Sequence, residues 1–347
     1  MGIVQLERFK LEGFLGSGSD YEVHAATDTE TGKPVVIKRP NPDYIARRLH
    51  QGVDRLSEQL IQVHEAIGDS LPYVAHLVGY TEVAQHNAYF GDFLKESYRV
   101  LVEERAKGLP LVSDIRDKFK GVPVGLGQNL FALHPLVPHP TNGHFTIHQQ
   151  LMDVEEAFHK AGHLLLDMRP QNVYFDPAEG RITVIDIGTM PTQGPAAQGK
   201  VSMGNQPKDI HDFFVEVFKF YVTPDSPPSD VAGYREPAGM RSIPQFSQQL
   251  DIMIRSFSGS RDAQLKEAAV AALQKIQKRV YSSFEDFRRD FNQYLALLEE
   301  RNKNLPDLQS KVRAWGQAMG MLSDGYWRKF LFDPESDLAQ YRTSYTS

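Results

Sequence analysis

The sequence predicts an α+β protein with a small β-rich N-terminal part and a larger, mostly helical C-terminal part. Residues 8–40 alternate short apolar runs with turns, which is the pattern of antiparallel hairpins. Beyond residue 245, apolar residues recur at helical spacing over 247–257, 261–276, 283–300 and 305–321. The length of 347 residues allows roughly two ordinary domains.

Composition excludes several classes of function. Apolar residues make up 41% of the chain and charged residues 24%, so a packed core is expected. The net charge of −6 and the lack of a basic patch argue against nucleic acid or an anionic membrane as a partner. Without cysteine, disulfides, thiolate metal sites and cysteine nucleophiles are excluded. No signal peptide or long apolar run is evident, so we expect a cytoplasmic protein.

The N-terminal strands are expected over Phe9–Leu15, Glu22–Thr27 and Val35–Lys38. The first two flank the turn Gly16-Ser17-Gly18-Ser19-Asp20-Tyr21, whose glycines let backbone N–H groups approach phosphate oxygens. Val23, on the strand that follows, is placed to cover a flat base. Glycines also occur in ordinary hairpins, so this turn alone is weak evidence.

Lys38, at the end of an apolar strand, can reach a phosphate if a carboxylate holds it. The helical pattern over Asp43–Ile67 supplies two carboxylates, Glu58 and Glu65. Glu58, near the middle of the helix, is the better partner, and Glu65 stays open. The buried face of this helix is expected at Leu56, Leu60, Ile61 and Val63. Two further strands are expected over Tyr73–Tyr80 and Tyr98–Glu103.

The segment His163–Gly188 brings polar groups together after a helix that begins at Thr146 and ends at Gly162. Asp167 stands five residues before Asn172, and Asp186 follows an apolar run. Carboxylate and amide oxygens bind hard cations such as Mg²⁺, while another carboxylate can orient a hydroxyl. These are the groups that a Mg-dependent phosphoryl-transfer site requires.

Taken in this order, the parts resemble those of the eukaryotic-type (Hanks-type) Ser/Thr protein kinases. Gly16, Gly18 and Val23 match the glycine-rich loop, with Tyr21 in place of its third glycine. The segment Val35–Lys38 resembles the Val-Ala-Ile-Lys strand, and Val100–Glu104 resembles the strand that leads into the hinge. Asp167, Arg169, Asn172 and Asp186 match the catalytic and metal-binding positions.

The resemblance implies a bilobal protein kinase-like fold. Its N-lobe would comprise residues 1–104, its C-lobe 105–300, and a helical extension with a polar tail 301–347. It also implies roles for the polar residues in a reaction that uses ATP and Mg²⁺. Asp167 would orient the acceptor hydroxyl, Arg169 would meet the transferred phosphate, Lys38 held by Glu58 would neutralise the α- and β-phosphates, and Asn172 and Asp186 would bind Mg²⁺.

The same resemblance implies the nucleotide contacts. Val102 would be the gatekeeper residue beside the base, the backbone of Glu103 and Arg105 would face the adenine, and Tyr174 would lie under it. The full set of expected ATP-binding residues is Leu15, Gly16, Gly18, Val23, Val36, Lys38, Glu103, Arg105 and Tyr174.

Several residues depart from the family pattern. Leu165 and Leu166 replace its usual His and Arg, Ile187 replaces its Phe, and no Ala-Pro-Glu follows. Three functions therefore stay open. The first is a divergent kinase that transfers the γ-phosphate of ATP to a Ser or Thr hydroxyl of an unidentified protein. The others are a pseudokinase that binds or scaffolds, and a small-molecule kinase in which residues 107–145 cap a pocket.

Overall fold

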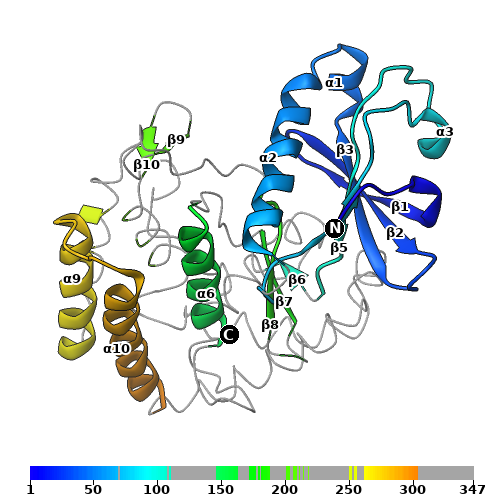
Figure 1. Cartoon of the computed structure of the whole chain (residues 1–347). Helices are drawn as coiled ribbons and strands as arrows, with labels where there is room; N and C mark the ends of the chain where they lie inside the picture. The colour runs from blue at the N-terminus through cyan, green and yellow to red at the C-terminus, as the bar shows by residue number, and fades with distance from the viewer. Residues whose placement is uncertain are drawn as a thin grey trace, which may run out of the picture. The chain divides into compact units, whose positions relative to one another are not determined.

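The protein has mixed α+β architecture, with an antiparallel sheet in its N-terminal part and helices later in the chain (Figure 1). The computed structural model describes residues 1–68, 71–107, 109–110, 146–162, 172–176, 179, 181–187, 201–203, 206–208, 211, 214, 218, 250–251, 254–255 and 262–303. The chain divides into two compact units. The first comprises Met1–Ala106 with Ile185–Met190, and the second comprises Lys107–Val184 with Pro191–Ser347.

A five-stranded antiparallel sheet forms the centre of the first unit. Its order is β1-β2-β3-β5-β4, and the strands are β1 (Phe9–Ser17), β2 (Tyr21–Asp28), β3 (Pro34–Pro40), β4 (Leu77–Tyr80) and β5 (Leu101–Glu104). The first three strands are confirmed within two residues at each end. The last two are shorter than expected, because only these residues find a paired neighbour in the sheet.

Two helices stand where one was expected between β3 and β4. They are α1 (Pro42–Ala46) and α2 (Gln51–Ile67), separated by Arg48 in the left-handed region at φ 57°. A non-glycine residue in that region cannot continue a right-handed helix. The buried face of α2 includes the expected Leu60, Ile61 and Val63, whereas Leu56 is only partly buried. A short 3-10 helix η1 (Leu6–Arg8) and helix α3 (Asn87–Phe90) complete the unit.

The sheet of the first unit has two distinct faces, because side chains alternate along each strand. On one face, which we call the core face, an apolar cluster contains Ala26, Val35, Ile37 and Val102 together with Leu6, Phe9, Ile45, Tyr98 and Val100. The opposite face, which we call the Lys38 face, carries Val23 and Ala25 of β2, Val36 and Lys38 of β3, and Leu101 and Glu103 of β5.

The N-terminal segment covers one edge of this sheet. Val4 N–H donates to the Tyr80 carbonyl at 2.9 Å, and Tyr80 N–H donates to the Gly2 carbonyl at 3.1 Å. Ile3 thereby forms a parallel bridge with Tyr80 on β4. A protected edge strand is a poor template for pairing with another chain.

Arg8 and Asp28 join the start of β1 to the turn between β2 and β3. The guanidinium donates twice to the carboxylate, at 2.8 and 2.6 Å, and Asp28 is buried. Thr31 donates its hydroxyl to Asp28 at 2.7 Å, and Glu30 N–H donates at 3.1 Å. These donors, led by Arg8, hold the pKa of Asp28 well below its usual range.

The second unit is described in separate elements. Strands β6 (Leu109–Pro110), β7 (Val173–Asp176) and β8 (Arg181–Val184) form an antiparallel sheet, and β9 (Val201–Met203) pairs with β10 (Gln206–Lys208). The helices are α6 (Thr146–Lys160), α9 (Ala263–Gln277) and α10 (Phe284–Lys303). Residues 250, 251, 254 and 255 are also helical. The helix expected over 305–321 lies outside the described residues.

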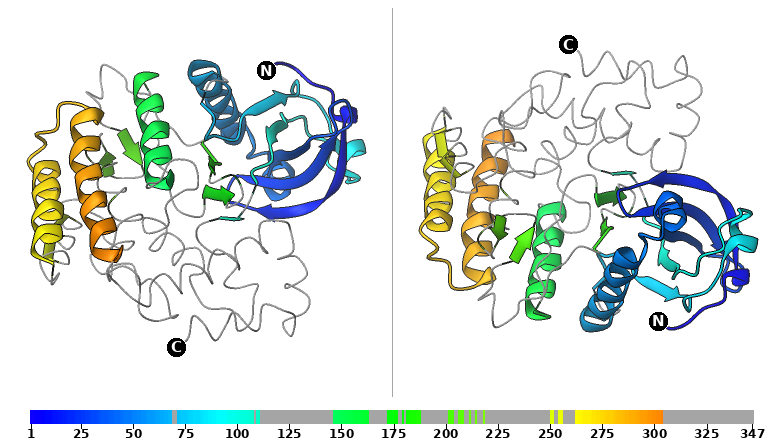
Figure 2. Two further views of the ribbon diagram at one scale, coloured as in Figure 1. Left: turned by 90° about the horizontal axis from the view of Figure 1, so that it is seen from below. Right: turned by 90° about the horizontal axis from the view of Figure 1, so that it is seen from above.

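Helix α10 packs between α6 and α9, as the two views of Figure 2 show. Arg288 of α10 donates to Asp153 at 2.6 Å and to Glu156 at 2.8 Å, both on α6. Buried aromatic side chains of α10 form a cluster with aromatic residues from earlier in the chain. Its members are Phe214, Phe218, Tyr281, Phe284, Phe287, Phe291 and Tyr294. Within the described part of the chain, no helix is long and apolar enough to cross a membrane.

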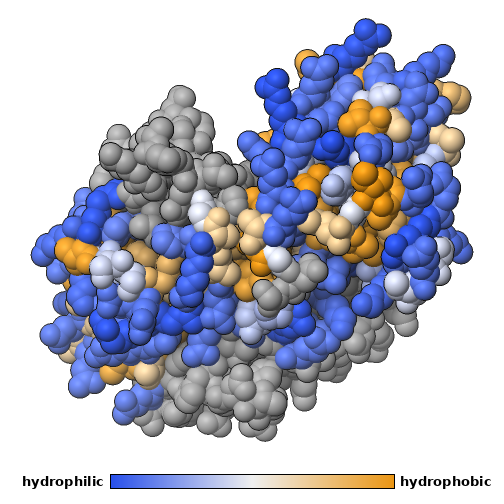
Figure 3. Space-filling model, in the orientation of Figure 1, coloured by the Kyte–Doolittle hydropathy of each residue, from blue (hydrophilic) through white to orange (hydrophobic). Residues whose placement is uncertain are grey.

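Apolar side chains also reach the surface of the first unit, where Figure 3 shows orange residues among blue polar ones. The large exposed apolar residues there include Phe14 and Leu15 on the glycine-containing hairpin, together with Leu49, Val83 and Phe93.

We expect Gly79→Ala to destabilise the protein by about 1–3 kcal/mol, because a Cβ at this position overpacks the sheet edge. That Cβ would lie 2.7 Å from the Gly2 carbonyl oxygen and would collide with a Val4 methyl. Gly52→Ala on α2 is the control, since its Cβ meets nothing within 4 Å and alanine favours a helix by about 1 kcal/mol. Urea unfolding of both variants measures the effect. Equal stability of the two would contradict the expectation.

We expect the stability that Asp28 contributes to disappear at acidic pH. Because its folded pKa is lowered, this contribution is complete above the unfolded value of about 3.9 and is lost as pH falls towards the folded pKa. Chemical unfolding of the wild type and of Asp28→Asn from pH 6 to pH 2.5 tests this. The stability difference should be largest above about pH 4 and should shrink below it. A difference that stays constant with pH would refute the assignment.

Candidate functional site

Lys38 lies at the centre of the Lys38 face. Its neighbour on β2 is Val23, and its neighbour on β5 is Leu101. The lysine side chain is only 9% exposed. The expected base-covering residues Val23 and Val36 share this face and are partly buried. The register between β2 and β3 therefore places Val23, Val36 and Lys38 on one face of the sheet.

The carboxylate that the structure places against Lys38 is that of Glu103. Lys38 Nζ lies 2.8 Å from Glu103 Oε2, and the glutamate side chain is 5% exposed. Val36, two residues before Lys38, faces Glu103 across β3 and β5. The pair therefore forms within the sheet, between adjacent strands.

The expected contact between Lys38 and Glu58 is replaced by this pair. Glu58 on α2 is exposed and pairs with Arg99, at 3.5 Å between Oε1 and the guanidinium. The alternative partner Glu65 is also exposed on α2. Helical spacing placed both residues on α2, but it did not specify which way each faces. The ion pair inside the sheet depends on strand register, which that spacing does not describe.

Val102 does not lie beside Lys38 as the gatekeeper assignment requires. It belongs to the cluster on the core face with Val35 and Ile37. A displacement of one residue along a strand reverses the face on which a side chain lies. Glu103 therefore occupies the position expected for Val102.

The backbone of Glu103 also has a different setting from the expected one. Glu103 lies inside the sheet, with Val36 of β3 on one side and Leu77 of β4 on the other. Arg105 follows the end of β5, and its guanidinium lies 3.7 Å from Glu12. The structure thus makes the Glu103 side chain, rather than its backbone, the group presented on the Lys38 face.

Asn41 organises the glycine-containing turn between β1 and β2, a role that sequence reasoning missed. Its amide donates to the carbonyls of Gly18 at 2.9 Å and Ser19 at 2.8 Å, and it accepts from the Ser17 hydroxyl at 2.6 Å. Gly18 N–H donates to the Tyr21 carbonyl at 2.8 Å, which closes the hairpin. Asn is a common turn residue, but its contact with a turn more than twenty residues earlier gives no local signal.

Tyr21, at the end of this turn, ties it to α2. Its hydroxyl lies 2.8 Å from that of Ser57, which in turn donates to the Val53 carbonyl at 3.0 Å. Burial raises the pKa of Tyr21, and the negative charges of Glu103, Asp20 and Asp186 raise it further.

Asp186 belongs to the first unit, although it follows β8 of the second by two residues. It is exposed and has φ 58°, in the left-handed region that few non-glycine residues occupy. Strained backbone of this kind is found at functional sites more often than elsewhere. The glycine-containing hairpin belongs to the same unit as Asp186.

Other expected site residues lie elsewhere in the chain. Leu15 lies on β1 at an irregular point of the β1–β2 pairing and is 38% exposed. Asn172 is buried directly before β7, and Tyr174 lies on β7 opposite Thr183, both in the second unit. Asp167 and Arg169 lie outside the described residues. Among the described residues, no three His, Asp or Glu side chains form a group that could hold a metal ion.

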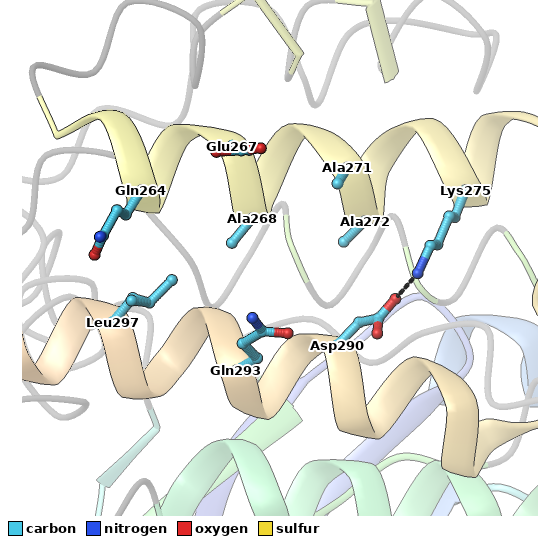
Figure 4. A pocket seen from close by; sticks show the side chains of 9 residues that line it. All are labelled: Gln264, Glu267, Ala268, Ala271, Ala272, Lys275, Asp290, Gln293 and Leu297. Carbon is cyan, nitrogen blue, oxygen red and sulfur yellow. Dashed lines mark hydrogen bonds and ion pairs between the residues drawn. The ribbon is translucent and has the colours of Figure 1, made fainter.

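A groove of about 510 Å³ lies between α9 and α10 in the second unit (Figure 4). Ala268, Ala271 and Ala272 line its α9 side, and Gln293 and Leu297 line its α10 side. Lys275 and Asp290 form an ion pair of 2.5 Å at one end. No expected site residue lines this groove, so we assign it no function.

No protein-family model matches this chain, and no curated protein sequence matches it.

We expect the link from Tyr21 to Ser57 to stabilise the hairpin by about 1 kcal/mol, the usual net value of a hydrogen bond. A double-mutant cycle of Tyr21→Phe and Ser57→Ala, followed by urea unfolding, isolates this coupling from the cost of each change alone. The cycle should give a coupling energy of about 0.5–1.5 kcal/mol. Strict additivity of the two substitutions would show that the hydroxyls do not interact.

Proposed function

We propose that this protein is a divergent, protein kinase-like phosphotransferase that uses ATP and Mg²⁺ and acts on a Ser or Thr hydroxyl. The observation that supports this most strongly is that three groups suited to Mg-ATP occur together in the first unit. A glycine-containing hairpin, a buried strand lysine and the strained Asp186 belong to one unit, built on a sheet of order β1-β2-β3-β5-β4. Each is a part that handling of Mg-ATP requires.

The chemistry follows from the residue types. The backbone of the hairpin around Gly16 and Gly18 would cover the phosphates, and Lys38 would neutralise part of their charge. By the resemblance to protein kinases, Asp186 and Asn172 would supply the oxygen ligands that Mg²⁺ prefers. Asp167 would orient the acceptor hydroxyl, and Arg169 offers a planar cation to the transferred phosphate. Bound Mg²⁺ would supply the charge neutralisation that phosphoryl transfer needs.

One observation favours a second candidate, a pseudokinase that binds or scaffolds with little catalysis. Lys38 is already paired with Glu103, a buried carboxylate on the adjacent strand. Nucleotide phosphates would have to compete with that carboxylate for the lysine. This pairing disfavours tight binding of Mg-ATP, but it is compatible with a kinase-like fold.

We expect Mg-ATP to raise the melting temperature of the wild type by several degrees, because ligand at 100 times its Kd adds about 2.7 kcal/mol. Lys38→Met and Asp186→Asn should lose most of this shift, whereas Asp167→Asn should keep it. Lys33→Met and Asp43→Asn are matched controls, since both residues are exposed outside the site. Thermal unfolding with and without Mg-ATP measures the shifts.

Phosphate transfer separates the two candidates. Using labelled ATP and generic protein acceptors, the kinase should transfer phosphate, and Asp167→Asn should reduce the rate by about 100-fold or more. Binding of Mg-ATP without transfer in the wild type would favour the pseudokinase. A wild type that shows neither a thermal shift nor transfer would refute the kinase and would restrict the pseudokinase to a scaffold that binds no Mg-ATP.

A further inference from the structure

We propose that Glu103 is an internal counter-ion that competes with the phosphates of a nucleotide for Lys38, and so limits the affinity of the site for polyanions. This inference rests on the proposed function, because it concerns the same lysine. It goes further because it names Glu103 as the residue that determines how the free energy of nucleotide binding divides between the phosphates and the nucleoside.

The first argument is the geometry of the pair. Lys38 Nζ and Glu103 Oε2 lie 2.8 Å apart, and the side chains are 9% and 5% exposed. Such a charge-assisted hydrogen bond is about twice as strong as a neutral one, and removing one partner of a buried pair leaves the other charge uncompensated. Both residues are presented on the Lys38 face, because Val36 and Lys38 face Glu103 and Leu101 across the two strands. A ligand that reaches Lys38 on this face therefore also meets Glu103.

The second argument concerns the other carboxylate oxygen. Glu103 Oε1 is buried and has no hydrogen-bond partner in the described part of the chain. An unpartnered buried acceptor keeps its negative potential, since no donor offsets it. An anion that approaches the pair is consequently repelled by this oxygen while it is attracted by Lys38.

The third argument is the charge of the site as a whole. Lys38 and Glu103 together are neutral, so a triphosphate gains little long-range attraction from them. Asp20 of the glycine-containing turn and Asp186 add further carboxylates to the same unit. Removing the charge of Glu103 raises the net charge of this pair by one unit. The affinity for a triphosphate should then rise by about tenfold, whereas that for an uncharged nucleoside should not change.

The test compares ligands that differ in charge. Isothermal titration of the full chain with Mg-ATP, adenosine and inorganic tripolyphosphate is carried out for the wild type and Glu103→Gln, which keeps the shape and one acceptor oxygen. We expect Glu103→Gln to bind ATP and tripolyphosphate about tenfold more tightly and adenosine within twofold of the wild type. The double variant Lys38→Met/Glu103→Gln should lose the gain.

Glu104→Gln is the matched control. Glu104 is the next residue on β5, is exposed, and stands opposite Val35 on the core face. Its substitution removes the same charge from the chain but not from the Lys38 face, so ATP binding should not change. Circular dichroism confirms that each variant is folded, and Glu103→Met, for which we expect the same gain, replaces Glu103→Gln if the latter does not fold.

The outcomes separate this inference from the proposed function. If the wild type binds ATP and Glu103→Gln binds it equally or more weakly, the inference is overturned and the proposed function stands. If neither protein binds ATP or adenosine but Glu103→Gln binds tripolyphosphate more tightly, the proposed function fails and the counter-ion role is supported. If Glu103→Gln changes no ligand's affinity, or if Glu104→Gln has the same effect, the counter-ion role is overturned.

Discussion

The buried ion pair between Lys38 and Glu103 is the interaction on which the first unit depends. A buried lysine needs a partner, because removing one member of such a pair costs about 3–5 kcal/mol. Here the partner comes from the adjacent strand, so the register between β3 and β5 determines the position of the lysine. The position of Lys38 is consequently set by the sheet, whereas Glu58 on α2 pairs with Arg99.

Side chains alternate along β3, so Lys38 and its neighbour Arg39 lie on opposite faces of the sheet. On the core face, next to Lys38 in sequence, Arg39 is buried between Glu22 and Asp92 and lies over the ring of Phe90, at 4.1 Å from its centroid. Arg39 therefore anchors β2 and the segment after α3, while Lys38 faces the candidate site. Consecutive basic residues on one strand serve opposite faces.

The glycine-containing hairpin is held in place by side chains, although glycines make its backbone permissive. Asn41 binds its carbonyls, and Tyr21 connects its second strand to α2 through Ser57. A hairpin restrained in this way loses less conformational freedom when it binds a ligand than a free loop would. Tyr21 thus adds a contact and reduces the flexibility of the hairpin.

The sequence by itself determined the elements whose signals are local. Apolar alternation and turn residues located β1, β2 and β3, and helical spacing located α6, α9 and α10. The resemblance to protein kinases named Lys38, Val23 and Val36, which the register of β2 and β3 places on one face of the sheet. Tertiary structure alone decided that Glu103 holds Lys38, that Val102 faces the core and that Asn41 binds the turn. These depend on register between strands distant in sequence, where a shift of one residue exchanges the faces.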